Sequence, residues 1–255
     1  MRPADTAPIL VFDLDETVLS INSFRRWVWF LIIGALPGIG FRRRVLLSLR
    51  VQLLLLRRKI GGIDHGRLLQ LLQAVWQEAA TDRGRTMARR FRAILIQYVR
   101  PNLRSLLALV AAGEADAILA SAALSDYAEE FGRELGFRHI LMTPASDDPT
   151  KFVNSGARKR DRVLGFLNER GWAGRPLILF TDHLDDLPLM RESSAVCWFG
   201  SREDLMTADA SGADTCFVSC RDQSSDRLCA IVETLGNYAA LARPDVGRVP
   251  EITSS

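Results

Sequence analysis

Cysteine, histidine and lysine are scarce in this chain. Its 255 residues include four cysteines, three histidines and three lysines. The cysteines all follow residue 196, and Cys216 and Cys220 have no further zinc-binding residue close enough to complete a metal site. So few cysteines exclude a disulfide-rich secreted scaffold and suit a reducing cytosol. We therefore expect free thiols and a cytoplasmic protein.

No apolar run is long enough to cross a membrane as one straight helix. The longest uncharged run, Trp27–Phe41, has fifteen residues and contains Pro37. As a single helix it would span about 22 Å, against roughly 30 Å of hydrocarbon. It is either a kinked buried helix or an interfacial or re-entrant hairpin flanked by arginines. A second apolar and basic segment, Val45–Lys59, follows it and favours contact with a membrane.

Acidic residues are rare between residues 21 and 104. This segment has 17 of the 33 basic residues but three of the 30 acidic ones, a balance of +14 that leaves −11 for the rest. Such asymmetry predicts an anionic partner for one part of the chain. Nucleic acid is a poor candidate, because the aromatic residues lie in the apolar run and not among the charges. We predict an anionic membrane surface, contacted peripherally through residues 24–59.

Outside this segment, short apolar runs alternate with helical patterns. Strands are expected at residues 8–12, 115–120, 139–142, 176–180, 195–199 and 215–218. Their alternation with helices predicts an α/β fold with a doubly wound parallel sheet. Residues 21–104 have helical patterns throughout. We therefore predict a core domain formed by residues 1–20 and 105–243, an inserted all-helical domain at 21–104, and a flexible tail at 244–255.

Carboxylates follow two of the predicted strands. Asp13 and Asp15 come after the first strand, and Asp182 and Asp186 come after the strand at 176–180. The carboxyl ends of parallel strands share one edge of a sheet, so these acids should converge there. Helix capping accounts for one of them but hardly for three. Their mutual repulsion calls for a cation, and oxygen ligands suit magnesium.

These residues resemble the four motifs of the haloacid dehalogenase superfamily of phosphotransferases, over roughly residues 8–220. The matching positions are Asp13, Asp15 and Thr17 in the first motif, Ser121 in the second, Lys159 in the third, and Asp182 with Asp186 in the fourth. The helical insertion directly after the first motif resembles the C1-capped branch, which includes the phosphoserine phosphatases. The resemblance implies a Rossmann-like core with a helical cap.

The resemblance also implies a phosphatase mechanism. Asp13 would attack phosphorus and form an aspartyl phosphate. Asp15 would protonate the leaving alcohol and then deprotonate the hydrolytic water. Thr17, Ser121 and Lys159 would bind the phosphate.

A magnesium ion completes the implied site. Its ligands would be Asp13, the Asp15 carbonyl and Asp182, with Asp186 in support. For the phosphate-binding lysine, the spacing before Asp182 favours Lys159 over Lys151, although Lys159 could also be a solvated helix charge.

The substrate is predicted less directly. Residues Val18–Ser23 lack the glutamate with which phosphoserine phosphatases hold an amino group, so an amino-acid substrate is not expected. Residues 24–30 and 180–190 resemble the membrane-associated phosphatidylglycerophosphate phosphatases of type C. We therefore predict a membrane lipid phosphate, such as phosphatidylglycerophosphate, as substrate. The alternatives are a soluble small-molecule phosphate and a non-enzymatic module that binds membrane or nucleic acid.

Overall fold

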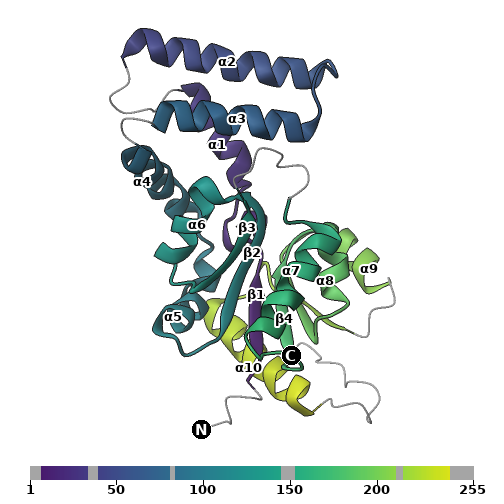
Figure 1. Cartoon of the computed structure of the whole chain (residues 1–255). Helices are drawn as coiled ribbons and strands as arrows, with labels where there is room; N and C mark the ends of the chain where they lie inside the picture. Colours follow the sequence, from purple (N-terminus) through teal and green to yellow (C-terminus); the bar gives the residue numbers. More distant parts are fainter. Residues whose placement is uncertain (1–6, 34–39, 81–83, 145–152, 211–214, 242–255) are drawn as a thin grey trace.

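The computed structural model describes residues 7–33, 40–80, 84–144, 153–210 and 215–241. Six parallel strands form one sheet in the order β3-β2-β1-β4-β5-β6 (Figure 1). The strands are β1 (Ile9–Phe12), β2 (Ala117–Leu124), β3 (His139–Thr143), β4 (Leu177–Thr181), β5 (Ala195–Trp198) and β6 (Cys216–Ser219). The predicted doubly wound parallel sheet is therefore confirmed.

Helices cover both faces of the sheet, because its central strands are apolar on both sides. Leu10 and Phe12 of β1 pack in the core with α5 (Arg104–Ala112), α6 (Ser125–Glu134) and α10 (Ser225–Leu241). Ile9 and Val11 face a second core with α7 (Gly156–Glu169), α8 (Leu187–Met190) and α9 (Arg202–Asp209). A strand buried on both faces reads as a continuous apolar run, as β1 does.

Four helices form the insertion after β1 and precede α5, the core helix that leads into β2. They are α1 (Ser23–Ile33), α2 (Phe41–Lys59), α3 (His65–Ala80) and α4 (Gly84–Leu95). The apolar run at 27–41 is not one helix, because Gly40, directly before α2, has an extended backbone with φ −57° and ψ 146°. The middle of the expected hairpin, residues 34–39, and the predicted tail at 244–255 lie outside the described residues.

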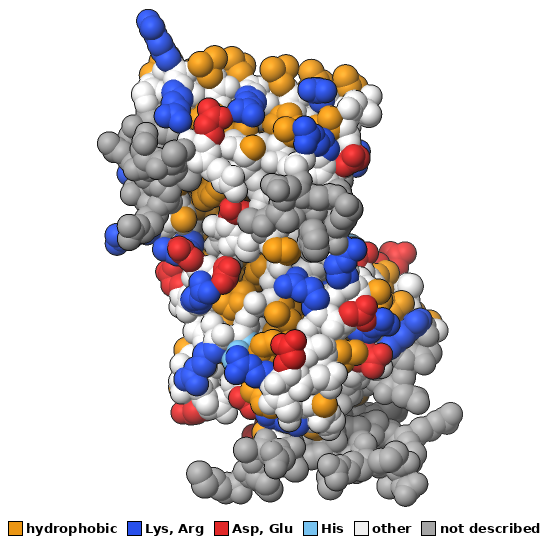
Figure 2. All heavy atoms as spheres, viewed as in Figure 1, with side chains coloured by type: hydrophobic (Ala, Val, Ile, Leu, Met, Phe, Trp, Pro, Cys, Tyr) orange, Lys and Arg blue, Asp and Glu red, His pale blue; other side chains and the backbone are white. Residues whose placement is uncertain are grey.

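The inserted helices share a core with the sheet domain. Tyr127 of α6 contacts Trp27 of α1 and Phe91 of α4, with ring centroids 5.7 and 5.2 Å apart. Gln73 of α3 donates a 2.6 Å hydrogen bond to Asp126 of α6. Helix α2 lies farthest from the sheet (Figure 1). Figure 2 shows hydrophobic and basic side chains along that end of the molecule. Within the described residues, no helix has both the length and the apolar character needed to cross a bilayer.

Gly136 permits the close approach of α5 to the turn after α6. Its φ is +93°, and a Cβ atom there would lie 2.6 Å from the Ala111 Cα atom. Gly171 also has a positive φ, +69°, but a Cβ atom there would meet nothing within 4 Å. An alanine at Gly171 would therefore cause backbone strain alone, whereas an alanine at Gly136 would cause both backbone strain and a steric clash.

We expect Gly136→Ala to lower the free energy of unfolding by about 3 kcal/mol, because strain and overpacking add. Gly171→Ala should cost about 1 kcal/mol, from strain alone. Urea denaturation of both variants measures the difference. Equal losses would contradict the packing of α5 described above.

Candidate active site

The chain turns sharply after β1 and places Asp13 at the edge of the sheet. The Asp13 N–H donates to the Phe180 carbonyl of β4 at 2.9 Å, and residues 14–18 form an irregular turn closed by a 2.8 Å bond from Leu19 N–H to the Leu14 carbonyl. Glu16 has a φ of 55° and is the one non-glycine with positive φ among the described residues. This conformation is costly for a residue with a side chain.

Lys159 joins the first and fourth motifs. Its Nζ atom lies 2.7 Å from Asp13 Oδ1 and 2.7 Å from Asp186 Oδ2. The lysine side chain is 2% exposed, so it is not a solvated helix charge. Thr181 Oγ1 donates a further 2.7 Å bond to Asp186. Burial lowers the pKa of Lys159, but the two carboxylates outweigh burial and raise that pKa above its ordinary value.

Burial opposes the charge on Asp13, while Lys159 favours it. The pKa of Asp13 is raised, first by burial and then by Asp186, although the Lys159 ammonium counteracts both. The alternative lysine, Lys151, lies outside the described residues. The structure thus brings Asp13, Lys159 and Asp186 into direct contact.

Asp182 faces Asp13 from the end of β4. Thr17 Oγ1 donates a 3.1 Å bond to Asp182 Oδ1, which connects the turn after β1 to the fourth motif. Burial, followed by repulsion from Asp13, raises the pKa of Asp182 to about 7. Asp13 and Asp182 are carboxylates with raised pKa values, and Asp13 repels the charge on Asp182, which is the electrostatic setting in which a divalent ion binds.

Asp15 points toward the first inserted helix. Its Oδ1 atom accepts a 2.8 Å hydrogen bond from the Ser23 N–H at the start of α1. The Ser23 hydroxyl lies 3.0 Å from the hydroxyl of buried Tyr127. Burial raises the pKa of Asp15 to about 7, against the lowering effect of Ser23. An acid with such a pKa can both donate and accept a proton near neutral pH.

Ser121 lies on β2, next to β1, where the pairing with β3 shifts register between Ala120 and Leu124. Its hydroxyl accepts a 3.3 Å bond from the Ala123 N–H. Asn154 is fully buried and donates to the carbonyl of Ser121 at 3.2 Å and to that of Leu141 at 2.7 Å. The sequence analysis did not single out Asn154. The one sequence feature that could have indicated its role is its position shortly before α7, where a buried amide can hydrogen-bond to two adjacent strands, here β2 and β3.

The donor set suits magnesium better than a transition metal. Among the described residues, no three acidic, histidine or cysteine side chains are grouped to hold one ion. Magnesium is commonly bound by one or two carboxylates with water and substrate oxygens. Asp13, Asp182 and the Asp15 carbonyl would form such a set. Asp186 is bonded to Lys159 and Thr181, so its support for an ion is indirect.

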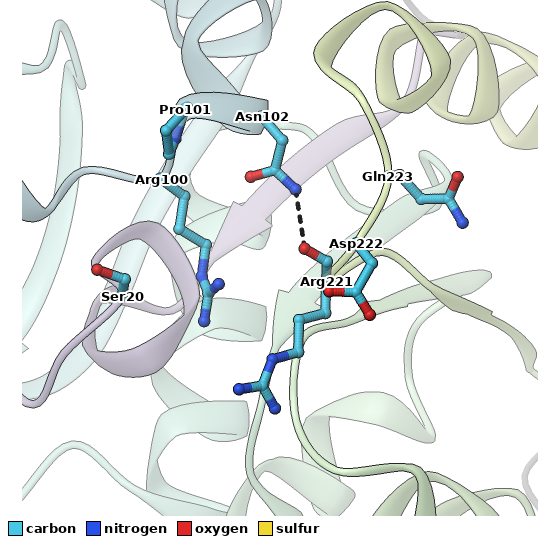
Figure 3. A pocket seen from close by; sticks show the side chains of 7 residues that line it. All are labelled: Ser20, Arg100, Pro101, Asn102, Arg221, Asp222 and Gln223. Atoms are coloured by element: carbon cyan, nitrogen blue, oxygen red, sulfur yellow. Dashed lines mark hydrogen bonds between the residues drawn. The ribbon is translucent and has the colours of Figure 1, made fainter.

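A shallow pocket of about 270 Å³ lies beside the turn that carries Glu16 (Figure 3). The residues lining it are Ser20, Arg100, Pro101, Asn102, Arg221, Asp222 and Gln223. Arg100 donates a 2.8 Å bond to the Glu16 carbonyl. On the other side of the pocket, the Asn102 side-chain amide donates a 3.3 Å hydrogen bond to the Arg221 carbonyl. Burial, and next Arg221, lowers the pKa of Arg100, against the raising effect of Asp182, Glu16 and Asp222. No sequence motif marked these residues.

A family model described as haloacid dehalogenase-like hydrolase matches residues 10–191, which include every motif residue discussed above. The chain belongs to the haloacid dehalogenase-like hydrolases. As in the C1-capped branch, the helical cap is inserted between β1 and β2. Comparison with curated proteins by sequence gives no match.

Solved structures show the same fold. A Bordetella pertussis Tohama I protein of unknown function has 17% identity and a TM-score of 0.63, covering 83% of this chain and 98% of its own. A probable phosphoserine phosphatase from Vibrio cholerae has 14% identity and a TM-score of 0.58, and the match covers 93% of this chain and 69% of that one. A substrate-bound phosphoserine phosphatase complex has 8% identity and a TM-score of 0.52, and the match covers 89% of this chain and 98% of that one. The C1-capped, phosphoserine phosphatase-like fold is thereby confirmed.

Lys159→Met should destabilise the protein strongly, because it leaves two buried carboxylates without their cation. We expect a loss of about 3 kcal/mol in the free energy of unfolding. Arg160→Met is the matched control on the same helix, since Arg160 pairs with Asp161 at the surface and should contribute at most about 1 kcal/mol. Denaturation without divalent ions measures both. Similar losses would contradict the buried position of Lys159.

Proposed function

We propose that the protein is a magnesium-dependent phosphomonoesterase that hydrolyses a small-molecule phosphate ester through an aspartyl phosphate on Asp13. The observation that supports it most is the buried contact of Lys159 with Asp13. Asp15, two residues after Asp13, is an acid whose pKa is about 7. Family membership and this buried charged site favour an enzyme over the binding-module alternative.

The first chemical step transfers the phosphoryl group to the protein. A carboxylate oxygen of Asp13 attacks phosphorus, and the bond from phosphorus to the ester oxygen breaks. Asp15 gives its proton to the departing alkoxide. Lys159 favours the ionised form of Asp13 against the effect of burial, and with Ser121 it is suited to bind phosphate oxygens.

The second step returns the enzyme to its starting state. Asp15, now a carboxylate, takes a proton from a water molecule whose oxygen attacks phosphorus. The bond from phosphorus to Asp13 breaks and inorganic phosphate leaves. When bound by Asp13, Asp182 and the Asp15 carbonyl, magnesium would offset the negative charge of the transferring phosphoryl group.

A soluble substrate is favoured by the surroundings of the site. The solved structures of similar fold include phosphoserine phosphatases. The pocket beside Glu16 is small, polar and carries Arg100 and Arg221, which suits an ester with a second anionic group better than an acyl chain. The missing glutamate after the first motif argues against an amino-acid ester. The four free cysteines suit action in the cytoplasm.

A lipid phosphate such as phosphatidylglycerophosphate is the second candidate. The observation in its favour is the exposed apolar surface of α2, on the cap that covers the branch's substrate site. We expect a soluble sugar or polyol phosphate to be hydrolysed with a kcat/KM at least about tenfold above that of phosphatidylglycerophosphate in mixed micelles. Preference for the lipid would reverse the two candidates.

Asp13→Asn should lower magnesium-dependent phosphate release from an aryl phosphate by about a thousandfold or more, because it removes the nucleophile. Asp185→Asn is the matched control, since Asp185 is 71% exposed in the loop that follows Asp182. Its activity should equal that of the unaltered protein. Undiminished hydrolysis by Asp13→Asn would contradict the proposal.

Asp15→Asn should separate the two steps. An aryl leaving group departs without a proton, so one equivalent of phenolate should appear in a burst while steady turnover falls by about 10²–10⁴-fold. Stopped-flow absorbance measures both phases. Loss of the burst together with turnover would show that Asp15 does not act mainly in the second step.

A further inference from the structure

Helix α2 has an apolar surface on the side that faces away from the protein. We call this surface the outer stripe. It consists of Phe41, Val45, Leu46, Leu49, Leu53, Leu56 and Ile60, where Ile60 directly follows the helix, and these residues are 38–78% exposed. Most of them recur every three or four residues, so they lie along one face.

The opposite face of α2 accounts for its folding. Leu47, Val51 and Leu54 are buried, and α2 contacts α1 and α3. Ser48 Oγ also donates a 2.6 Å bond to the Ile32 carbonyl of α1. The outer stripe therefore adds nothing to the internal core. An exposed apolar surface of this length marks an interaction site.

Basic residues border the outer stripe. Helix α2 has seven of them, Arg42, Arg43, Arg44, Arg50, Arg57, Arg58 and Lys59, and no acidic residue. At 100° per residue, Arg42 falls within the stripe, Arg50 and Arg57 on one side of it and Lys59 on the other, whereas Arg44 and Arg58 fall toward the buried face. Arg50 pairs with Glu78 of α3, whereas Arg57, Arg58 and Lys59 are exposed at the end of the helix.

We propose that the outer stripe is a peripheral docking surface for an anionic phospholipid membrane. Its aliphatic side chains would enter the boundary between headgroups and acyl chains, and the bordering arginines and Lys59 would meet lipid phosphates. The inference does not depend on the proposed function, because a soluble ester can be hydrolysed by an enzyme held at a membrane.

Charge complementarity favours a membrane over a second copy of this chain. In a symmetric dimer through the outer stripe, two helices with seven basic residues and no acidic residue each would face one another. Such like-charge contact is unfavourable, whereas an anionic bilayer supplies both apolar volume and counter-charge. Helix α2 also lies at the end of the molecule farthest from the sheet, where a flat surface can reach it (Figures 1 and 2).

The test is sedimentation of the full chain with vesicles of phosphatidylglycerol and phosphatidylcholine, or of phosphatidylcholine alone. The protein should pellet with the anionic vesicles, less so at high salt, and not with the neutral ones. Leu49→Gln with Leu53→Gln should weaken binding about tenfold or more, and so should Arg57→Gln combined with Lys59→Gln. Leu109→Gln with Met206→Gln is the control, since both are exposed apolar residues outside the cap.

Each outcome decides the inference. Absence of pelleting, or equal pelleting by the stripe variant and the control, would overturn it. A change from dimer to monomer in the stripe variant, measured by light scattering, would assign the stripe to a second copy and overturn it too. Hydrolysis of an aryl phosphate should be the same in all these variants. If the unaltered protein pellets with the anionic vesicles but does not hydrolyse the aryl phosphate, the proposed function is overturned and the docking surface is not.

Discussion

One buried ammonium group, shared by two carboxylates, holds the reactive edge of the sheet together. Lys159 comes from α7, Asp13 from the end of β1, and Asp186 from the loop after β4, and both contacts are 2.7 Å. Removing one partner of such a buried set costs several kcal/mol, so the three elements tolerate little relative movement. The same contact favours the ionised form of Asp13, whereas burial favours its protonated form. Stability of the fold and reactivity of the site thus depend on one interaction.

The cap is connected to the chemistry through its first residue. Ser23 begins α1, donates its N–H to Asp15 and contacts Tyr127 with its hydroxyl. Tyr127 in turn belongs to the aromatic core between cap and sheet domain. A shift of α1 would therefore change the surroundings of Asp15. This coupling gives the insertion a role in positioning the acid, in addition to any role in choosing the substrate.

Much of the fold and the acidic residues of the site could be predicted from sequence, because both depend on local signals. Strand-like runs followed by Asp13, Asp15 and Asp182 indicated one edge of a parallel sheet, and the sheet is as expected. The pocket of Arg100 and Arg221 could not be predicted, since its walls are about 120 residues apart and share no pattern. The segment that carries the outer stripe was predicted from its apolar and basic residues, but its exposed face was not, because α2 is apolar on two faces and only its packing on α1 and α3 decides which is exposed.

The central claim is that Asp13 carries the phosphoryl group during turnover. The most direct measurement is acid quenching of the Asp15→Asn protein during reaction with an aryl phosphate, followed by peptide mass spectrometry. The account predicts one phosphoryl group on the peptide that contains Asp13, absent when Asp13 is also changed to Asn. The account would be contradicted if the unaltered protein turns over the substrate but the quenched variant has no phosphoryl group on this peptide. A phosphoryl group on another peptide instead would contradict it too.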